Sequence, residues 1–180
     1  MPVEAIWILM AVAVALALAR LAWVWHRYRG RMVVTCPENH KTAGVTVDGS
    51  HAVASGLAKA PDLRLSTCSR WPERRECGQQ CLSQIQSSPE DCLVRNILVR
   101  WYRGKVCASC GQSFADIEWS RKPALLTAGQ VSLEWSQVSA DELHEVLAAS
   151  KPLCFACHMA STLVREHPEL AVDRSSRQTH

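Results

Sequence analysis

The sequence predicts an α+β protein in which an N-terminal transmembrane helix precedes a small cysteine-rich domain with a metal site. Three observations lead to this fold class. The chain begins with a long apolar run, it carries nine cysteines among 180 residues, and four of these form two CxxC pairs. Short alternating patterns typical of strands and 3.6-residue patterns typical of helices lie between the cysteines. A chain of this length, less one membrane span, holds one or two small domains.

The N-terminal segment, residues 1–26, is predicted to be a membrane anchor. The run from Ala5 to Trp25 is apolar except for Arg20. At about 1.5 Å per residue, it is long enough for a hydrocarbon core of roughly 30 Å. A cleaved signal peptide is the alternative, but the first four residues contain no Lys or Arg and include Glu4. We therefore expect the anchor to remain, with Arg20 snorkelling towards an interface lined by Trp23 and Trp25.

The charges that flank the span predict its orientation. Arg27, Arg29 and Arg31 follow it, whereas only the α-amine is basic before it. The positive-inside rule then places the C-terminal domain of this single-pass protein in the cytoplasm, at the inner membrane. Because the cytoplasm is reducing, the nine cysteines are expected to be ligands rather than disulfides.

Residues 27–104 are interpreted as a cysteine-rich α+β region. Strands are expected where aliphatic residues alternate with polar ones, at residues 32–35, 45–47 and 63–65. Asp48 is placed to cap a helix that reaches about residue 59. His51 in that helix is more typical of a helix surface or core than of a ligand.

A core helix is expected at the end of this region. Ser88 suits a helix cap, Pro89 suits the first helical position, and Asp91 stands where a capping-box acid would. An apolar stripe continues to Trp101, and Gly104 ends the helix. This helix leads directly to the first CxxC pair.

A cluster of five further cysteines lies in the same region. If residues 77–86 are helical, Cys77 and Cys81 lie at i and i+4 on one face, where two thiolates can bind one ion. Cys36, Cys68 and Cys92 could complete the ligand set. A second metal or redox site is one interpretation, and packing as small buried hydrophobic residues is the other.

The main candidate metal site consists of Cys107, Cys110, Cys154 and Cys157. Two residues between cysteines allow a tight turn to direct both sulfurs at one ion. Gly111 suits such a turn because glycine accepts positive φ. The second pair opens a helical pattern at residues 155–167, whose N-terminal dipole favours thiolate. The pattern predicts a four-thiolate Zn²⁺ site.

Residues 105–168 are expected to form one region around this site. Two strands that each carry a Trp, at residues 117–119 and 131–135, are expected to shield the metal. Ser139 and Glu142 form a capping-box pattern for a short helix, which Lys151-Pro152 ends. The tail, residues 169–180, is polar and is expected to be disordered.

A turn-borne cysteine pair, a β-hairpin and a helix-borne pair together resemble the zinc-ribbon and treble-clef families, over roughly residues 105–166. As a whole, the chain resembles bacterial single-pass membrane proteins with a cysteine-rich cytoplasmic domain. The first resemblance implies a metal-binding fold, and the second implies no particular activity.

Cys154–His158 also matches CxxCH, the attachment motif of c-type haem, with His158 as the axial ligand. Haem attachment disagrees with the predicted cytoplasmic side and leaves the pair Cys107 and Cys110 without a role. We therefore place His158 outside the four ligands. An iron–sulfur electron carrier and a thiol oxidoreductase are further alternatives, although no βαβ pattern accompanies the CxxC pairs.

The sequence shows no paired-carboxylate, Ser/His/Asp or phosphate-loop pattern, so an enzyme is not favoured. The net charge of +3 is too small to suggest nucleic acid as a partner. The function we expect is that of a membrane-anchored zinc-binding scaffold, adaptor or metal-homeostasis factor, with a protein partner that the sequence does not identify.

Overall fold

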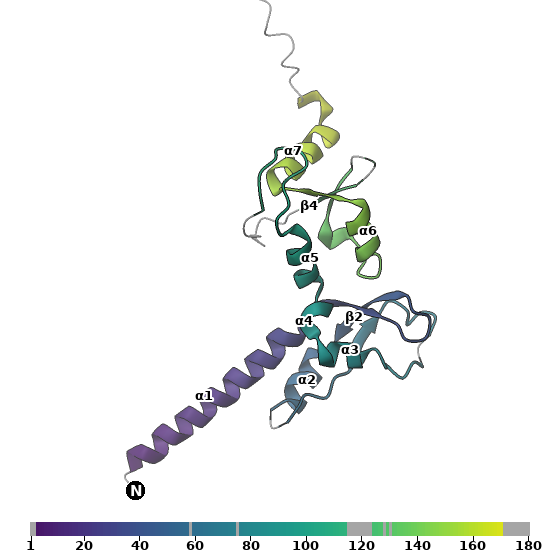
Figure 1. The fold of residues 1–180 in the computed structure, drawn as a ribbon. Coiled ribbons are helices and arrows are strands. Elements are labelled where there is room, and N and C mark those ends of the chain that lie inside the picture. Colours follow the sequence, from purple (N-terminus) through teal and green to yellow (C-terminus); the bar gives the residue numbers. More distant parts are fainter. Residues whose placement is uncertain are drawn as a thin grey trace, which may run out of the picture. The chain divides into compact units, whose positions relative to one another are not determined.

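The computed structural model describes residues 3–57, 59–74, 76–114, 124–127, 129 and 131–170. The chain divides into two compact units, Met1–Ile97 and Leu98–His180. Both units combine helices with a three-stranded antiparallel sheet, so the mixed helix-and-sheet fold class is confirmed (Figure 1).

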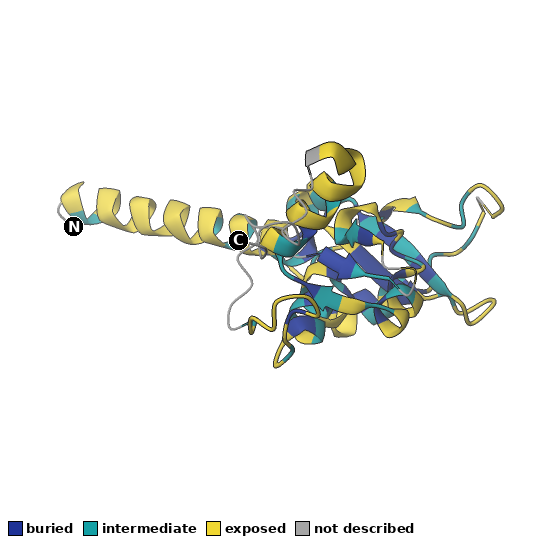
Figure 2. Ribbon diagram, turned by 90° about the horizontal axis from the view of Figure 1, so that it is seen from above, coloured by how far each residue is buried: buried dark blue, intermediate teal, exposed yellow. Residues whose placement is uncertain are grey.

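The first unit begins with helix α1, Val3–Tyr28. This helix is long and apolar enough to cross a membrane. Most of its length is exposed, as Figure 2 shows, but Val24 and Tyr28 near its end are buried in the core of the unit. Arg20 donates a hydrogen bond from Nε to the Gly56 carbonyl oxygen at 3.2 Å. The last turns of α1 therefore belong to the folded unit.

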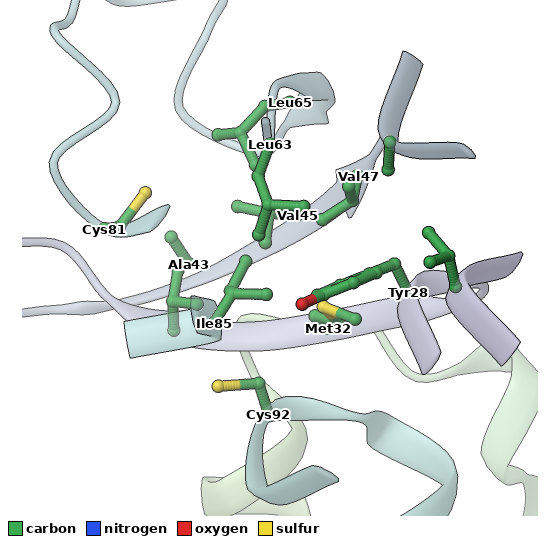
Figure 3. Packing of buried hydrophobic residues seen from close by; sticks show 13 residues of the cluster. Tyr28, Met32, Ala43, Val45, Val47, Leu63, Leu65, Cys81, Ile85 and Cys92 are labelled. Atoms are coloured by element: carbon green, nitrogen blue, oxygen red, sulfur yellow. The ribbon is translucent and has the colours of Figure 1, made fainter. Parts of the chain in front are cut away.

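The sheet of this unit has the strand order β1 (Arg31–Thr35), β2 (Thr42–Val47) and β3 (Leu65–Cys68). Its strands alternate buried and less buried positions most clearly in β2, as a half-buried sheet requires. In the antiparallel register Met32 lies opposite Val45, and Val34 lies opposite Ala43. These pairs direct apolar side chains into the core, where Met32, Val45 and Ile85 belong to one buried cluster (Figure 3).

Helix α2, Gly49–Ser55, is capped as predicted. Asp48 Oδ1 accepts a hydrogen bond from the His51 backbone N–H at 3.0 Å. The helix ends at Ser55, with Gly56 as its C-cap, rather than near residue 59. His51 Nε2 lies 2.9 Å from the Asp62 carboxylate, in agreement with a surface role for this histidine.

Two helix predictions in this region are corrected. The predicted helix 77–86 begins only at Leu82, as α3 (Leu82–Ser87), because Gln79 has a positive φ of 51° that an α-helix does not allow. The predicted core helix is divided into α4 (Pro89–Cys92) and α5 (Val94–Tyr102). Leu93 separates them with extended dihedral angles, and it forms an isolated β-bridge with Met32.

The predicted cap of this helix also differs. Pro89 occupies the expected first position, but the Ser88 side chain makes no capping hydrogen bond. The boundary between the two units falls within α5.

The sheet of the second unit has the order β5 (Ser132–Glu134), β4 (Ala124–Leu126) and β6 (Lys151–Leu153). The predicted strand 131–135 is present as β5, followed by the short 3-10 helix Trp135–Gln137. Lys151-Pro152 forms the edge strand β6 instead of only ending a helix, which is possible because an edge strand tolerates proline. The predicted strand 117–119 and the tail from residue 171 lie outside the described residues.

Two helices complete this unit, α6 (Leu143–Ala149) and α7 (Phe155–Glu166), with a short 3-10 helix at Pro168–Leu170. The predicted capping box before α6 does not form, because Glu142 makes no side-chain cap and Ser139 instead donates to the Asp141 carboxylate. The start of α7 agrees with the prediction. Ser161 of α7 and Ser132 of β5 share a hydrogen bond of 2.9 Å between their hydroxyl groups.

Candidate metal centre

The first cysteine pair lies on a tight turn that backbone hydrogen bonds close at both ends. The Cys107 N–H donates to the Gln112 carbonyl oxygen at 2.8 Å, and the Gly111 N–H donates to the Cys107 carbonyl oxygen at 2.9 Å. Gly111 has a φ of +74°, a conformation that glycine adopts without a Cβ penalty. The positive φ expected at Gly111 is confirmed.

The second pair is placed by β6 and the first turn of α7. Cys154 is the N-cap of α7, and its sulfur accepts from the Cys157 N–H at 3.5 Å. The Ala108 N–H donates to the Pro152 carbonyl oxygen at 2.9 Å, which ties the first turn to β6. The Cys154 N–H donates to Cys107 Sγ at 3.3 Å. Strand, turn and helix end thus bring both pairs together.

The sulfurs of Cys107, Cys110, Cys154 and Cys157 all lie within 4.8 Å of one another. The Sγ atoms of Cys110 and Cys154 are 3.7 Å apart. In a tetrahedral site with metal–sulfur bonds of about 2.3 Å, two sulfurs are separated by about 3.8 Å. The four cysteines could therefore bind a metal ion, and an all-sulfur ligand set suits thiophilic ions such as zinc or iron.

Cys107 and Cys154 differ in their thiol pKa. Burial raises the pKa of Cys107, but the backbone N–H groups of Cys110, Cys154 and Ser109 outweigh this effect and lower the pKa to about 6. Burial, together with the neighbouring thiols, raises the pKa of Cys154 to about 12. Cys107 is therefore the more acidic of these two thiols.

His158 is buried beside the site, on the first turn of α7. Its backbone N–H donates to the Cys154 carbonyl oxygen at 2.9 Å. Its Nδ1 atom has no hydrogen-bond partner among the described residues. The group of ligand atoms within 4.8 Å does not include His158, and its role outside the four ligands stays a prediction.

The five cysteines of the second cluster are divided by the structure. Cys36, Cys68, Cys77 and Cys81 line one pocket of about 110 Å³ in the first unit. The prediction that Cys77 and Cys81 share a helical face is wrong, because Cys77 lies before α3 in a segment without regular structure and Cys81 is only its N-cap.

Cys92 is not among the described residues that line this pocket. It is buried in the hydrophobic core, where burial first and the Asp91 charge second raise its pKa. For Cys92 the packing interpretation agrees with the structure. Figure 3 shows it on a different side of Ile85 from Cys81.

Arg70 is the residue of this region that sequence reasoning does not single out. Its Nη1 atom lies 2.7 Å from Cys36 Sγ and 3.4 Å from a carboxylate oxygen of Glu38. Burial raises the pKa of Cys36, but the Glu38 backbone N–H and the Arg70 guanidinium outweigh it, so the pKa is lowered. Cys36 and Arg70 are 34 positions apart in the sequence, and no local pattern indicates their contact.

Compared with models of protein families, with curated proteins and with solved structures, the chain has no match.

Proposed function

We propose that this chain is a membrane-anchored zinc-binding protein that acts as a scaffold, adaptor or metal-homeostasis factor. The observation that carries the proposal is the group of four cysteine sulfurs within 4.8 Å of one another. Four thiolates fill a tetrahedral zinc site and leave no position for a reactive water. The metal would accordingly be structural, and a catalytic role is not proposed.

Three features support a zinc-ribbon or treble-clef-like arrangement around the ion. The first pair sits on a glycine-containing turn, β4 and β5 are antiparallel neighbours, and the second pair opens α7. The helix N-terminus favours negative charge, so the start of α7 suits two thiolates.

A single-pass anchor with the cysteine-rich units in the cytoplasm is the second part of the proposal. The length and exposed apolar surface of α1 support insertion into a bilayer. Arg27, Arg29 and Arg31 after the helix support the cytoplasmic side. A reducing compartment would keep the thiols available for metal.

A role as a scaffold or adaptor is supported by the exposed face of α7. Phe155, Met159 and Leu163 follow one another at i, i+4 and i+8, and each is more than a third exposed. Residues at this spacing lie on one side of a helix. The metal would hold the start of this helix in place, so that the apolar face is presented to a protein partner.

Metal analysis of the purified full-length chain tests the proposal. Zinc should copurify with the chain, and Cys107→Ser or Cys157→Ser should remove one equivalent. Cys92→Ser is the matched control, because it also replaces a buried cysteine but lies outside the group of four. Absorbance separates the alternatives, since zinc gives no colour, haem gives a Soret band and an iron–sulfur cluster gives a brown absorbance.

His158→Ala separates the four-cysteine site from attachment of haem. The substitution should leave the zinc content unchanged, because His158 is placed outside the ligand set. If it abolished cofactor retention while Cys107→Ser did not, the four-cysteine assignment would be wrong.

A further inference from the structure

We propose that Cys36, Cys68, Cys77 and Cys81 form a second site for a thiophilic metal ion, in the first unit. The proposal goes beyond the proposed function, which requires only the site in the second unit. Its starting point is that four cysteines from three separate stretches of the chain line the same pocket. Sulfur-only sites of this kind select ions such as zinc, copper(I) or iron in clusters.

The turn that carries Cys36 has the same backbone hydrogen bonds as the turn that carries Cys107. The Cys36 N–H donates to the Lys41 carbonyl oxygen at 2.9 Å, and the His40 N–H donates to the Cys36 carbonyl oxygen at 2.9 Å. The fifth residue of each turn has a positive φ, 56° at His40 and 74° at Gly111. The chain therefore builds one type of cysteine turn twice, once in each unit.

The two turns differ at one position that decides where the other ligands come from. Asn39 stands where the second turn has Cys110, and its side-chain oxygen accepts from the Lys41 N–H at 3.1 Å. The Cys36 turn thus offers one sulfur instead of two. Cys68, at the end of β3, is held near it by the β2–β3 pairing, where it lies opposite Val45.

Cys77 and Cys81 would supply the remaining two sulfurs. Both line the pocket from the segment before α3. Among the described residues, the cysteines whose sulfurs all lie within 4.8 Å of one another are the four of the second unit. The four sulfurs of the pocket are therefore spaced more widely than those of the second unit. A Cβ atom at Gly78, between the two cysteines, would meet nothing within 4 Å, so this position is not packed against another part of the described chain.

Charge and hydrogen-bond donors around the pocket suit a metal-thiolate centre. Four thiolates with one divalent ion carry a net charge of about −2, which donors around the ligands must stabilise. The Arg70 guanidinium is 2.7 Å from Cys36 Sγ, and Arg74 also lines the pocket. Trp71 lines it as well, and its buried Nε1 has no hydrogen-bond partner in the described part of the chain. An indole N–H of this kind is free to donate to a sulfur.

The test measures metal stoichiometry in the full-length chain, purified under reducing conditions and loaded with Zn²⁺ or Co²⁺. The unaltered chain should hold two equivalents. Ser substitutions at the four pocket cysteines should each leave one, namely Cys36→Ser, Cys68→Ser, Cys77→Ser and Cys81→Ser. Cys92→Ser is the matched control and should keep two, because Cys92 is a buried cysteine of the same unit that does not line the pocket.

Two measurements keep the test independent of folding defects in the Ser variants. Arg70→Gln removes a neighbour of the site but no ligand, so the chain should still bind two equivalents. A competing chelator should remove one of them more easily, because the affinity of the second site for the metal should fall by roughly 10–100-fold. In the unaltered chain, alkylation of Cys77 should be slow with metal bound and fast after chelation.

The outcomes also separate this proposal from the proposed function. If the chain binds one metal equivalent and only Cys107→Ser or Cys157→Ser removes it, the proposed pocket site is wrong and the four-cysteine centre of the second unit stands. If the chain binds one metal equivalent and only the pocket substitutions remove it, the pocket site is supported and the four-cysteine centre of the second unit is wrong. A disulfide among the pocket cysteines in the reduced, metal-loaded chain would also overturn the second site.

Discussion

Replacing Cys107 with serine should unfold the surroundings of the metal centre as well as empty it. Among the described residues, the hydrophobic cluster that contains Cys107 has two other buried members, Ala124 and Leu153, and partly buried residues pack against them, namely Phe114, Leu126, Cys154 and Cys157. Burial of a leucine side chain contributes about 1.5–3 kcal/mol, and each further buried carbon contributes about 0.8 kcal/mol. A structural zinc ion contributes roughly 10–16 kcal/mol. The metal contribution is thus larger than the apolar contribution of the buried members of this cluster.

Hydrogen–deuterium exchange of the full-length chain, read by mass spectrometry, measures the effect. In Cys107→Ser the amides of Cys107 and Ala108, which donate to Gln112 and Pro152, should exchange rapidly, together with the β4–β6 pairing. Amides of β1 and β2 should keep their protection, since the substitution lies outside that unit. Cys92→Ser should leave the centre protected. Metal loss with unchanged protection of the Ala108 amide would refute the reasoning.

Three further predictions concern topology, the tyrosine of α5 and the core. A reporter that is active only in the periplasm, fused after His180, should give no signal, and a signal would reverse the orientation. Tyr102→Phe removes a buried hydrogen bond of 2.6 Å to the Ala124 carbonyl oxygen and should cost about 1 kcal/mol at pH 8. Burial raises the pKa of Tyr102 in the folded state. The contribution of Tyr102 to the free energy of unfolding is therefore complete below about pH 10, the ordinary tyrosine pKa. It is lost as the pH rises further, by about 1.4 kcal/mol per pH unit. If denaturant titrations up to about pH 11 gave a constant difference in stability between the variant and the unaltered chain, this prediction would be wrong. Ile85→Ala, at a fully buried position, should cost about 2–5 kcal/mol in urea unfolding of the first unit, and a loss below about 1 kcal/mol would mean that this core is loosely packed.

Local patterns predicted the elements that depend on local chemistry. Asp48 caps α2 and Gly111 takes a positive φ, as expected from their residue types. The start of α7 at Phe155 followed from the helical pattern after the second cysteine pair. The spacing of the two CxxC pairs singled out the four cysteines that the structure brings together.

Contacts between distant residues explain what the sequence did not predict. Leu93 leaves the helical pattern because it bridges to Met32 of β1, and an apolar stripe gives no sign of that bridge. The sequence pattern predicts only a helix end at Pro152, whereas pairing with Leu125 makes it part of a strand. The contact of Arg70 with Cys36 likewise depends on the fold of the first unit.

The continuity of α1 with the first unit has a mechanical consequence. A Cβ atom on Gly49 would lie 2.9 Å from Cζ3 of Trp25, and one on Gly56 would lie 3.2 Å from Cγ2 of Val24, so α1 packs closely along α2. Only two residues separate the end of α1 from β1. The close packing and the short connection couple the orientation of the sheet to that of α1. In the proposed bilayer, a neighbouring membrane helix that rotated the anchor would therefore also rotate the cysteine-lined pocket, which belongs to the same unit.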